Sequence, residues 1–97
     1  MIERHVTFNV IPGQEKDFEA LFKEAYSVAM SKQPGFVSVT LLKEHEKEAV
    51  YQMTIRFQSL ETAAAWRDSE DHKALSSKIK ALYKESTVQV YEVISGK

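Results

Sequence analysis

The chain has 97 residues, 43% of them hydrophobic and 28% charged, which is the composition of one globular domain spanning residues 1–97. Its 13 basic and 14 acidic residues are interspersed and give a net charge of -1, so neither a nucleic-acid surface nor a patch for anionic lipid is indicated. There is no cysteine, which excludes disulfides and thiolate sites, and neither a signal-peptide pattern nor an apolar run of bilayer length, which indicates a cytoplasmic protein.

The first half of the chain predicts a strand, a helix and a strand hairpin. Residues 6–10 alternate between apolar and polar, the period of a half-buried strand, and Pro12-Gly13 ends it. From about 14 to 32 the apolar residues recur at every third or fourth position, which predicts an amphipathic helix. Two strands follow at 36–44 and 49–58, and the short charged link between them indicates an antiparallel hairpin.

The second half predicts two helical pieces and a last strand. A helix at 60–67 begins after Ser59, a favourable N-cap residue. A second, nearly continuous helix at about 70–85 is capped by Asp68 or Ser69, and the last strand is expected at 87–94. The apolar stripe of the second helix consists of Leu75, Ile79, Leu82 and Tyr83.

This order, βαββαβ, predicts an α+β ferredoxin-like fold in which a four-stranded antiparallel sheet carries both helices on one face. The uniformly apolar alternation of the first and third strands should lie under the helices; it consists of Val6, Phe8, Val10, Tyr51, Met53, Ile55 and Phe57. The second and fourth strands carry apolar residues on both alternations. Because an apolar sheet face needs a cover, we expect a homodimer through the sheet faces.

Trp66 and His72 are the pair of residues that most clearly suggests a site. A large flat ring and a titratable imidazole near one end of a helix are the elements of a pocket for an aromatic molecule. If Asp68 or Ser69 caps the second helix, His72 lies in its first turn, where the helix dipole favours the neutral imidazole. In an unbroken helix the two side chains would lie roughly a third of a turn apart. The same residues also fit a core tryptophan and a packing or capping histidine.

Several segments, in order and spacing, resemble the antibiotic biosynthesis monooxygenase family of the dimeric α/β barrel superfamily. The resemblance spans almost the whole chain, and the tract around Trp66 is its most family-like part. It is carried by the opening strand with Pro12-Gly13, Phe18-Glu19-Ala20-Leu21, Gln33-Pro34-Gly35-Phe36, Arg56-Phe57-Gln58-Ser59 and Ala64-Ala65-Trp66-Arg67 with His72 and Tyr83. It implies two ferredoxin-like subunits that press their sheets together into one barrel.

The resemblance also implies a monooxygenase that oxidises a small or polycyclic phenol- or quinol-type substrate between helices and sheet. A deprotonated phenol donates electrons well enough to react with O₂ directly, so the protein has to bind the ring, remove a proton and exclude water. His72 is then the proton acceptor. The substrate-binding residues are Trp66, Phe8, Met53, Phe57 and Tyr83. No flavin, metal or haem is expected, since the chain has no dinucleotide fingerprint, thiolate or histidine cluster.

Two alternatives use the same fold. Haem-degrading relatives carry an Asn on the first strand that would fall near Val6 here, and a His that would fall at Ser76; Asn9 has the opposite strand parity. Iron ligation by His72 is therefore not supported by the spacing. A non-catalytic ligand-binding dimer stays open, because its sequence requirements do not differ from those of the oxygenase.

Overall fold

The computed structural model describes residues 1–97 and confirms the predicted βαββαβ order and the α+β ferredoxin-like class. None of its helices is both long enough and apolar enough to span a membrane. The elements are β1 (Ile2–Val10), α1 (Glu15–Leu21), the π-helix η1 (Phe22–Tyr26), α2 (Ser27–Ser31), β2 (Phe36–Lys43), β3 (Val50–Phe57), α3 (Leu60–Asp68), α4 (Glu70–Lys80) and β4 (Tyr83–Glu92).

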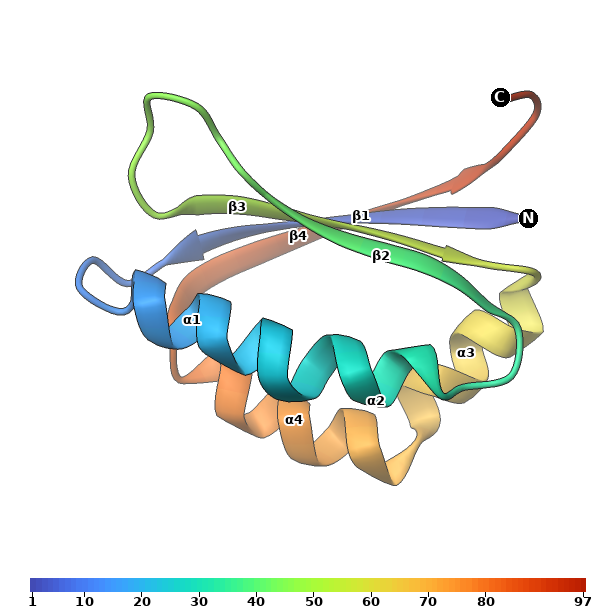
Figure 1. The fold of residues 1–97 in the computed structure, drawn as a ribbon, viewed down its shortest axis with the longest axis horizontal. Coiled ribbons are helices and arrows are strands. Elements are labelled where there is room, and N and C mark those ends of the chain that lie inside the picture. The colour runs from blue at the N-terminus through green and yellow to red at the C-terminus, as the bar shows by residue number, and fades with distance from the viewer.

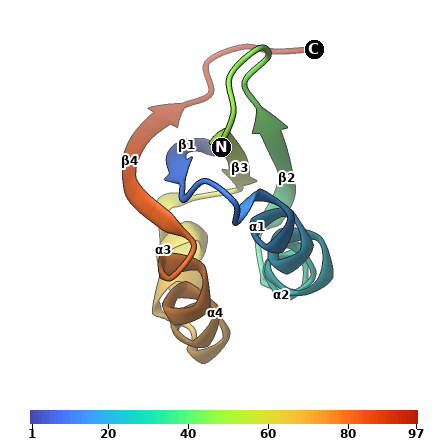
Figure 2. The same cartoon turned by 90° about the vertical axis from the view of Figure 1, so that its left-hand side faces the viewer.

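The strands form one antiparallel sheet in the order β2-β3-β1-β4. All the helices lie on the same face of this sheet (Figure 1). The end-on view separates them into two columns, with α1 and α2 below β2 and with α3 and α4 below β4 (Figure 2). The opposite face of the sheet carries no helix, and the β2–β3 turn and the C-terminal end of the chain rise on that side (Figure 1).

The first helical region is not a regular α-helix. Its buried residues recur at every fourth position, at Phe18, Phe22, Tyr26 and Met30. In a regular α-helix each four-residue step turns the side chain by about 40°, so this row would rotate away from the sheet. The wider turn of η1, in which the N–H of Ser27 donates to the carbonyl of Phe22, offsets that rotation. Tyr26 is therefore buried, whereas Val28, two residues further on, is 43% exposed.

The second helical region ends earlier than the sequence predicted. α4 stops at Lys80 rather than near 85, and β4 runs from Tyr83 to Glu92 rather than from 87 to 94. β4 pairs with β1 along the length of both strands, from Glu92 opposite Ile2 to Tyr83 opposite Val10. Pairing with a neighbouring strand therefore overrides the local helical pattern, and Tyr83 is a strand residue rather than a member of the helical stripe.

The strand register decides which side chains face the helices, because directly opposed residues share a face of the sheet. Val39 and Leu41 lie opposite Ile55 and Met53, and Val88 and Val90 lie opposite Val6 and Arg4. Most apolar residues of β2 and β4 are thus on the helix-facing side. The uncovered face is mostly polar, and the expected second apolar alternation is reduced to a few residues. Its apolar members include Leu42, Val50 and Tyr91.

Candidate functional site

Three rings from three helical segments meet in one cluster: Tyr26 of η1, Trp66 of α3 and His72 of α4. The ring centroids are 5.6 Å apart for Tyr26 and Trp66, 5.1 Å for Trp66 and His72, and 6.2 Å for Tyr26 and His72, all in edge-to-face geometry. This arrangement places the positive edge of one ring on the negative face of another. The structure therefore brings together the two residues that the sequence paired, and adds Tyr26 to them.

The contact between the rings of Trp66 and His72 depends on Ser69, which lies between α3 and α4. Its backbone is extended, with φ of -71° and ψ of 152°, so α3 ends there and α4 begins in a new direction. Its Oγ donates to the carbonyl oxygen of Trp66 at 2.7 Å and accepts from the backbone N–H of His72 at 3.1 Å. Of the two predicted caps, Asp68 and Ser69, the structure uses Ser69, and the break replaces the third-of-a-turn offset with direct ring contact.

The three rings differ in how far a ligand can reach them. Trp66 is 1% exposed and Tyr26 is 7% exposed, so both belong to the packed core. His72 is only half-buried. Of the three rings, the imidazole is therefore the one that is accessible from solvent.

The surroundings of His72 favour its neutral form. Burial lowers the pKa of the imidazole, and the positive charge of Arg4 lowers it further, while a hydrogen bond to the backbone of Arg67 acts in the opposite direction. A neutral imidazole is the form that accepts a proton. Burial likewise raises the pKa of Tyr26 to about 12, so its hydroxyl stays protonated at neutral pH.

Arg4 is a charged residue on the helix-facing alternation of β1, between the buried Ile2 and the core residue Phe8. Its charge acts on both His72 and Tyr26. The side chain is half-buried and makes no hydrogen bond or ion pair. The sequence did not lead us to predict a role for Arg4, although it shows a charged residue on the same strand alternation as the apolar Val6 and Phe8. Tyr26 was missed for another reason, since its place in the cluster depends on the π-helical turn.

The other predicted substrate-binding residues lie deeper in the molecule. Phe8, Met53 and Phe57 are 5%, 0% and 1% exposed and belong to the hydrophobic core. Tyr83 is half-buried, and its ring contacts Phe8 edge-to-face at 5.1 Å. As the chain is packed here, a ligand reaches the first three only if the helices move away from the sheet.

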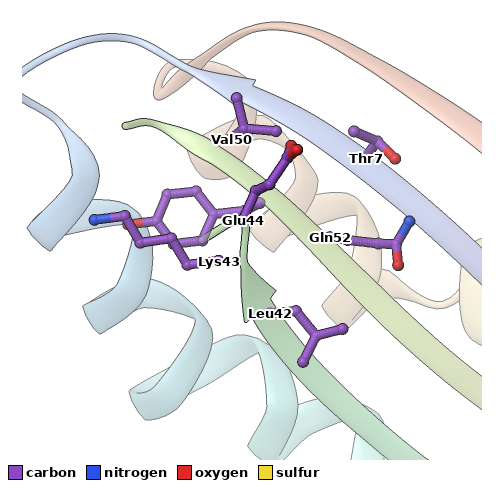
Figure 3. A pocket seen from close by; sticks show the side chains of 7 residues that line it. Thr7, Leu42, Lys43, Glu44, Val50 and Gln52 are labelled. Carbon is purple, nitrogen blue, oxygen red and sulfur yellow. The ribbon is translucent and has the colours of Figure 1, made fainter. Parts of the chain in front are cut away.

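The main pockets of the chain lie away from the ring cluster, and neither Trp66 nor His72 lines any of them. One hollow, of about 370 Å³, opens where β2 and β3 approach their connecting turn. Figure 3 shows its lining, in which Thr7 and Gln52 project from β1 and β3 beside Leu42 of β2. These three side chains belong to the uncovered face of the sheet. None of these main pockets is therefore bordered by both Trp66 and His72, whose rings pack against each other.

The remaining polar candidates are engaged elsewhere. Asn9 lies on the uncovered face and donates from its side chain to Glu85 at 3.1 Å, so it does not face the ring cluster. Arg56 is ion-paired with Glu3 on the same face. No group of three histidine or acidic residues comes close enough to hold a metal ion.

The comparisons with known proteins agree with this fold and decide the family. The family model described as antibiotic biosynthesis monooxygenase matches residues 1–78. This chain belongs to that family. Its matched region contains the whole ring cluster, including Ser69 and His72. A search of curated proteins gave no match.

Solved structures of the same fold include three proteins of low sequence identity to this chain. SnoaB, a cofactor-independent oxygenase from Streptomyces nogalater, is 21% identical with a TM-score of 0.89 over 98% of this chain and 94% of that one. A conserved protein from Methanosarcina mazei Go1 is 18% identical with a TM-score of 0.84 over 93% and 89%. A protein described as an antibiotic biosynthesis monooxygenase is 12% identical with a TM-score of 0.86 over 98% and 100%. At these identities the likeness establishes the fold.

Proposed function

We propose that this protein is a cofactor-independent monooxygenase that oxidises an electron-rich aromatic substrate of the phenol or quinol type. The observation that carries the proposal is a half-buried imidazole, biased toward its neutral form, in edge contact with Trp66 and Tyr26. Membership of the antibiotic biosynthesis monooxygenase family supports it. SnoaB, which shares the fold, is described as a cofactor-independent oxygenase.

In this proposal His72 accepts a phenolic or enolic proton and Trp66 forms a wall of the binding site. The anion that remains donates electrons to O₂. For an anthrone-type carbon the balance is CH₂ + O₂ → C=O + H₂O, in which the carbon loses the four electrons that O₂ gains. One oxygen atom enters the product and the other leaves as water, so no external reductant enters the balance. The protein's tasks are then proton transfer, orientation and exclusion of bulk water.

The proposed ligand lies between helices and sheet, with Phe8, Met53, Phe57 and Tyr83 as its further contacts. Three of these side chains are buried in the core, so a ligand can contact them only if the helices shift away from the sheet. The π-helical turn of η1 supports such a shift, since π-helical turns often mark functional positions in helices.

Turnover of an anthrone and of a naphthoquinol tests the proposal. The substitution His72→Ala should lower kcat by about 10² to 10⁴, the usual contribution of a general base. His45→Ala is the matched control, because His45 is an exposed residue of the β2–β3 turn. Trp66→Phe should mainly raise KM.

Thermal unfolding of each variant separates loss of activity from loss of fold. Absence of turnover by the parent protein, or an unchanged kcat in a folded His72→Ala variant, would refute the catalytic assignment. Ligand binding without turnover would instead support a non-catalytic ligand-binding protein.

A further inference from the structure

Arg4 has no partner within the chain. It shares its face of β1 with Ile2, Val6 and Phe8, and its guanidinium makes no hydrogen bond or ion pair, although the residue is half-buried. Arg56, on the opposite face of the sheet, has the partner that an arginine side chain usually has, since it is ion-paired with Glu3. Removing a cation from water without an anion is unfavourable, and a guanidinium stays charged at any physiological pH. The chain therefore carries an uncompensated positive charge beside the ring cluster.

The wider electrostatic surroundings have the same sign. The charges that act most strongly on His72 belong to Arg4, Arg67 and Lys80, and none of these cations is held in an ion pair. The acids closest in sequence, Glu70 and Asp71, are exposed in the first turn of α4. A protein whose net charge is -1 thus concentrates positive charge at this position.

An apolar strip lies next to Arg4 on the same face of the sheet. Val90 is directly opposite Arg4 and Val88 is directly opposite Val6, yet the two valines are 53% and 48% exposed. They are exposed because β4 is an edge strand that the helices do not cover completely. Arg4 therefore adjoins an open apolar strip on β4, and its charge acts on the half-buried imidazole of His72.

We propose that the ligand of this site is an aromatic anion, with its carboxylate or ionised phenol bound by Arg4 and its ring against His72 and the apolar strip of Val88 and Val90. This inference rests on the proposed function for the location of the site and narrows the substrate class to negatively charged aromatics. A bidentate guanidinium–carboxylate contact would supply the missing partner of Arg4. A second subunit docked on the uncovered sheet face would lie across the sheet from Arg4, which faces the helices.

Binding of 2-naphthoate and its neutral analogue 2-naphthamide to the full chain, measured by calorimetry, tests the inference. The carboxylate should bind at least about ten-fold more tightly than the amide, and the preference should weaken as salt is added. Arg4→Gln should lower the affinity for 2-naphthoate about ten-fold or more and leave that for 2-naphthamide unchanged. Arg56→Gln is the control and should change neither affinity, because its guanidinium faces away from the cluster.

The stability of the Arg4 variants gives a second readout. The substitution Arg4→Met replaces an unpaired, half-buried cation with an apolar side chain, so it should leave the Tm of the protein unchanged or raise it. This result is typical of residues that serve binding rather than folding. Equal affinities for the two ligands, no binding of 2-naphthoate, or undiminished binding by Arg4→Gln would overturn the inference. If the protein oxidises an anthrone but does not prefer anionic ligands, the proposed oxygenase function is supported and this inference is refuted. If it binds anions through Arg4 but oxidises no substrate, this inference is supported and the proposed oxygenase function is refuted.

Discussion

At the residue scale, the proposed chemistry depends on His72 and on the groups that set its charge. The imidazole is half-buried, and burial and Arg4 both lower its pKa. A histidine of this kind is neutral at pH 7 and accepts a proton from an acidic C–H or O–H group. In the proposed mechanism Arg4 has two effects: it opposes protonation of the imidazole and it binds the anionic group of the ligand.

The pH dependence of His72 follows from these signs. The pKa of His72 in the folded protein lies below the ordinary value of 6.5. The imidazole therefore stays neutral until the pH approaches this lowered pKa, and the fraction of proton-accepting His72 falls below it. NMR titration of the imidazole protons should show this low pKa, and the acid limb of kcat/KM should follow it. Arg4→Gln should raise both, because the variant lacks the cation that opposes protonation. A limb at or above 6.5, or one that Arg4→Gln does not move, would contradict the assignment.

At the scale of the elements, the site is made by two departures from regular helix. The π-helical turn of η1 keeps Tyr26 on the buried row, and the extended residue Ser69 separates α3 from α4. Each departure moves one ring into the cluster around Trp66. These two breaks in the helices are needed for the ring cluster, because a regular helix would point the same side chains in other directions.

Substitution of the two serine caps separates stability from function. Ser69→Ala and Ser59→Ala each remove a side chain that accepts from a helix N-terminal N–H, so each should cost about 1 kcal/mol of unfolding free energy in chemical denaturation. Only Ser69→Ala should also shift the NMR titration of His72 and lower kcat, since Ser69 bonds both Trp66 and His72. Equal effects of the two variants on His72 would show that the cap does not position the imidazole.

The turn into β2 depends on a glycine at position 35. Gly35 has φ of +79°, and a Cβ there would lie 2.5 Å from the Cβ of Thr62 in the capping box of α3. Gly13 has φ of +93° but open space around it. Gly13→Ala should therefore cost only the backbone term of about 1 kcal/mol, and Gly35→Ala should cost about 1–3 kcal/mol more through overpacking. Urea unfolding of both variants measures the difference, and equal losses would rule out the close contact as the cause.

At the scale of the whole molecule, one sheet face is covered by helices and the other is bare (Figures 1 and 2). We infer a homodimer through the bare faces. It is supported by the small size of the chain and by Leu42 and Tyr91, which are 47% and 43% exposed on that face. The 370 Å³ hollow beside Leu42 would then lie at the subunit interface.

Sedimentation of charge variants tests the dimer. Leu42→Glu places a carboxylate on the bare face and should shift the protein toward monomer at micromolar concentration. Val28→Glu is the matched control, because Val28 is 43% exposed on α2, and it should leave the dimer intact. A parent protein that is monomeric and well folded at micromolar concentration would disprove the assembly.

The sequence by itself determined the fold class, the order of the elements and the pairing of Trp66 with His72. Strand and helix periods, the serine cap at 59, a cap at 68 or 69, and the glycine turns are local signals, and each indicates its element without reference to the rest of the chain. The family resemblance rested on the same segments and is confirmed by the match over residues 1–78.

Only the tertiary structure decided where α4 ends, which faces β2 and β4 present, and which residues complete the cluster. Residues 83–86 join β4 because β1 offers hydrogen bonds along its full length, an interaction with a segment distant in sequence. Tyr26 reaches Trp66 through a π-helical turn that a 3.6-residue period does not reveal. Arg4 is visible in the sequence as a charge on an apolar alternation, but its lack of a partner depends on every element packed around it. Local periodicity thus specifies the elements, and long-range pairing and packing specify the site.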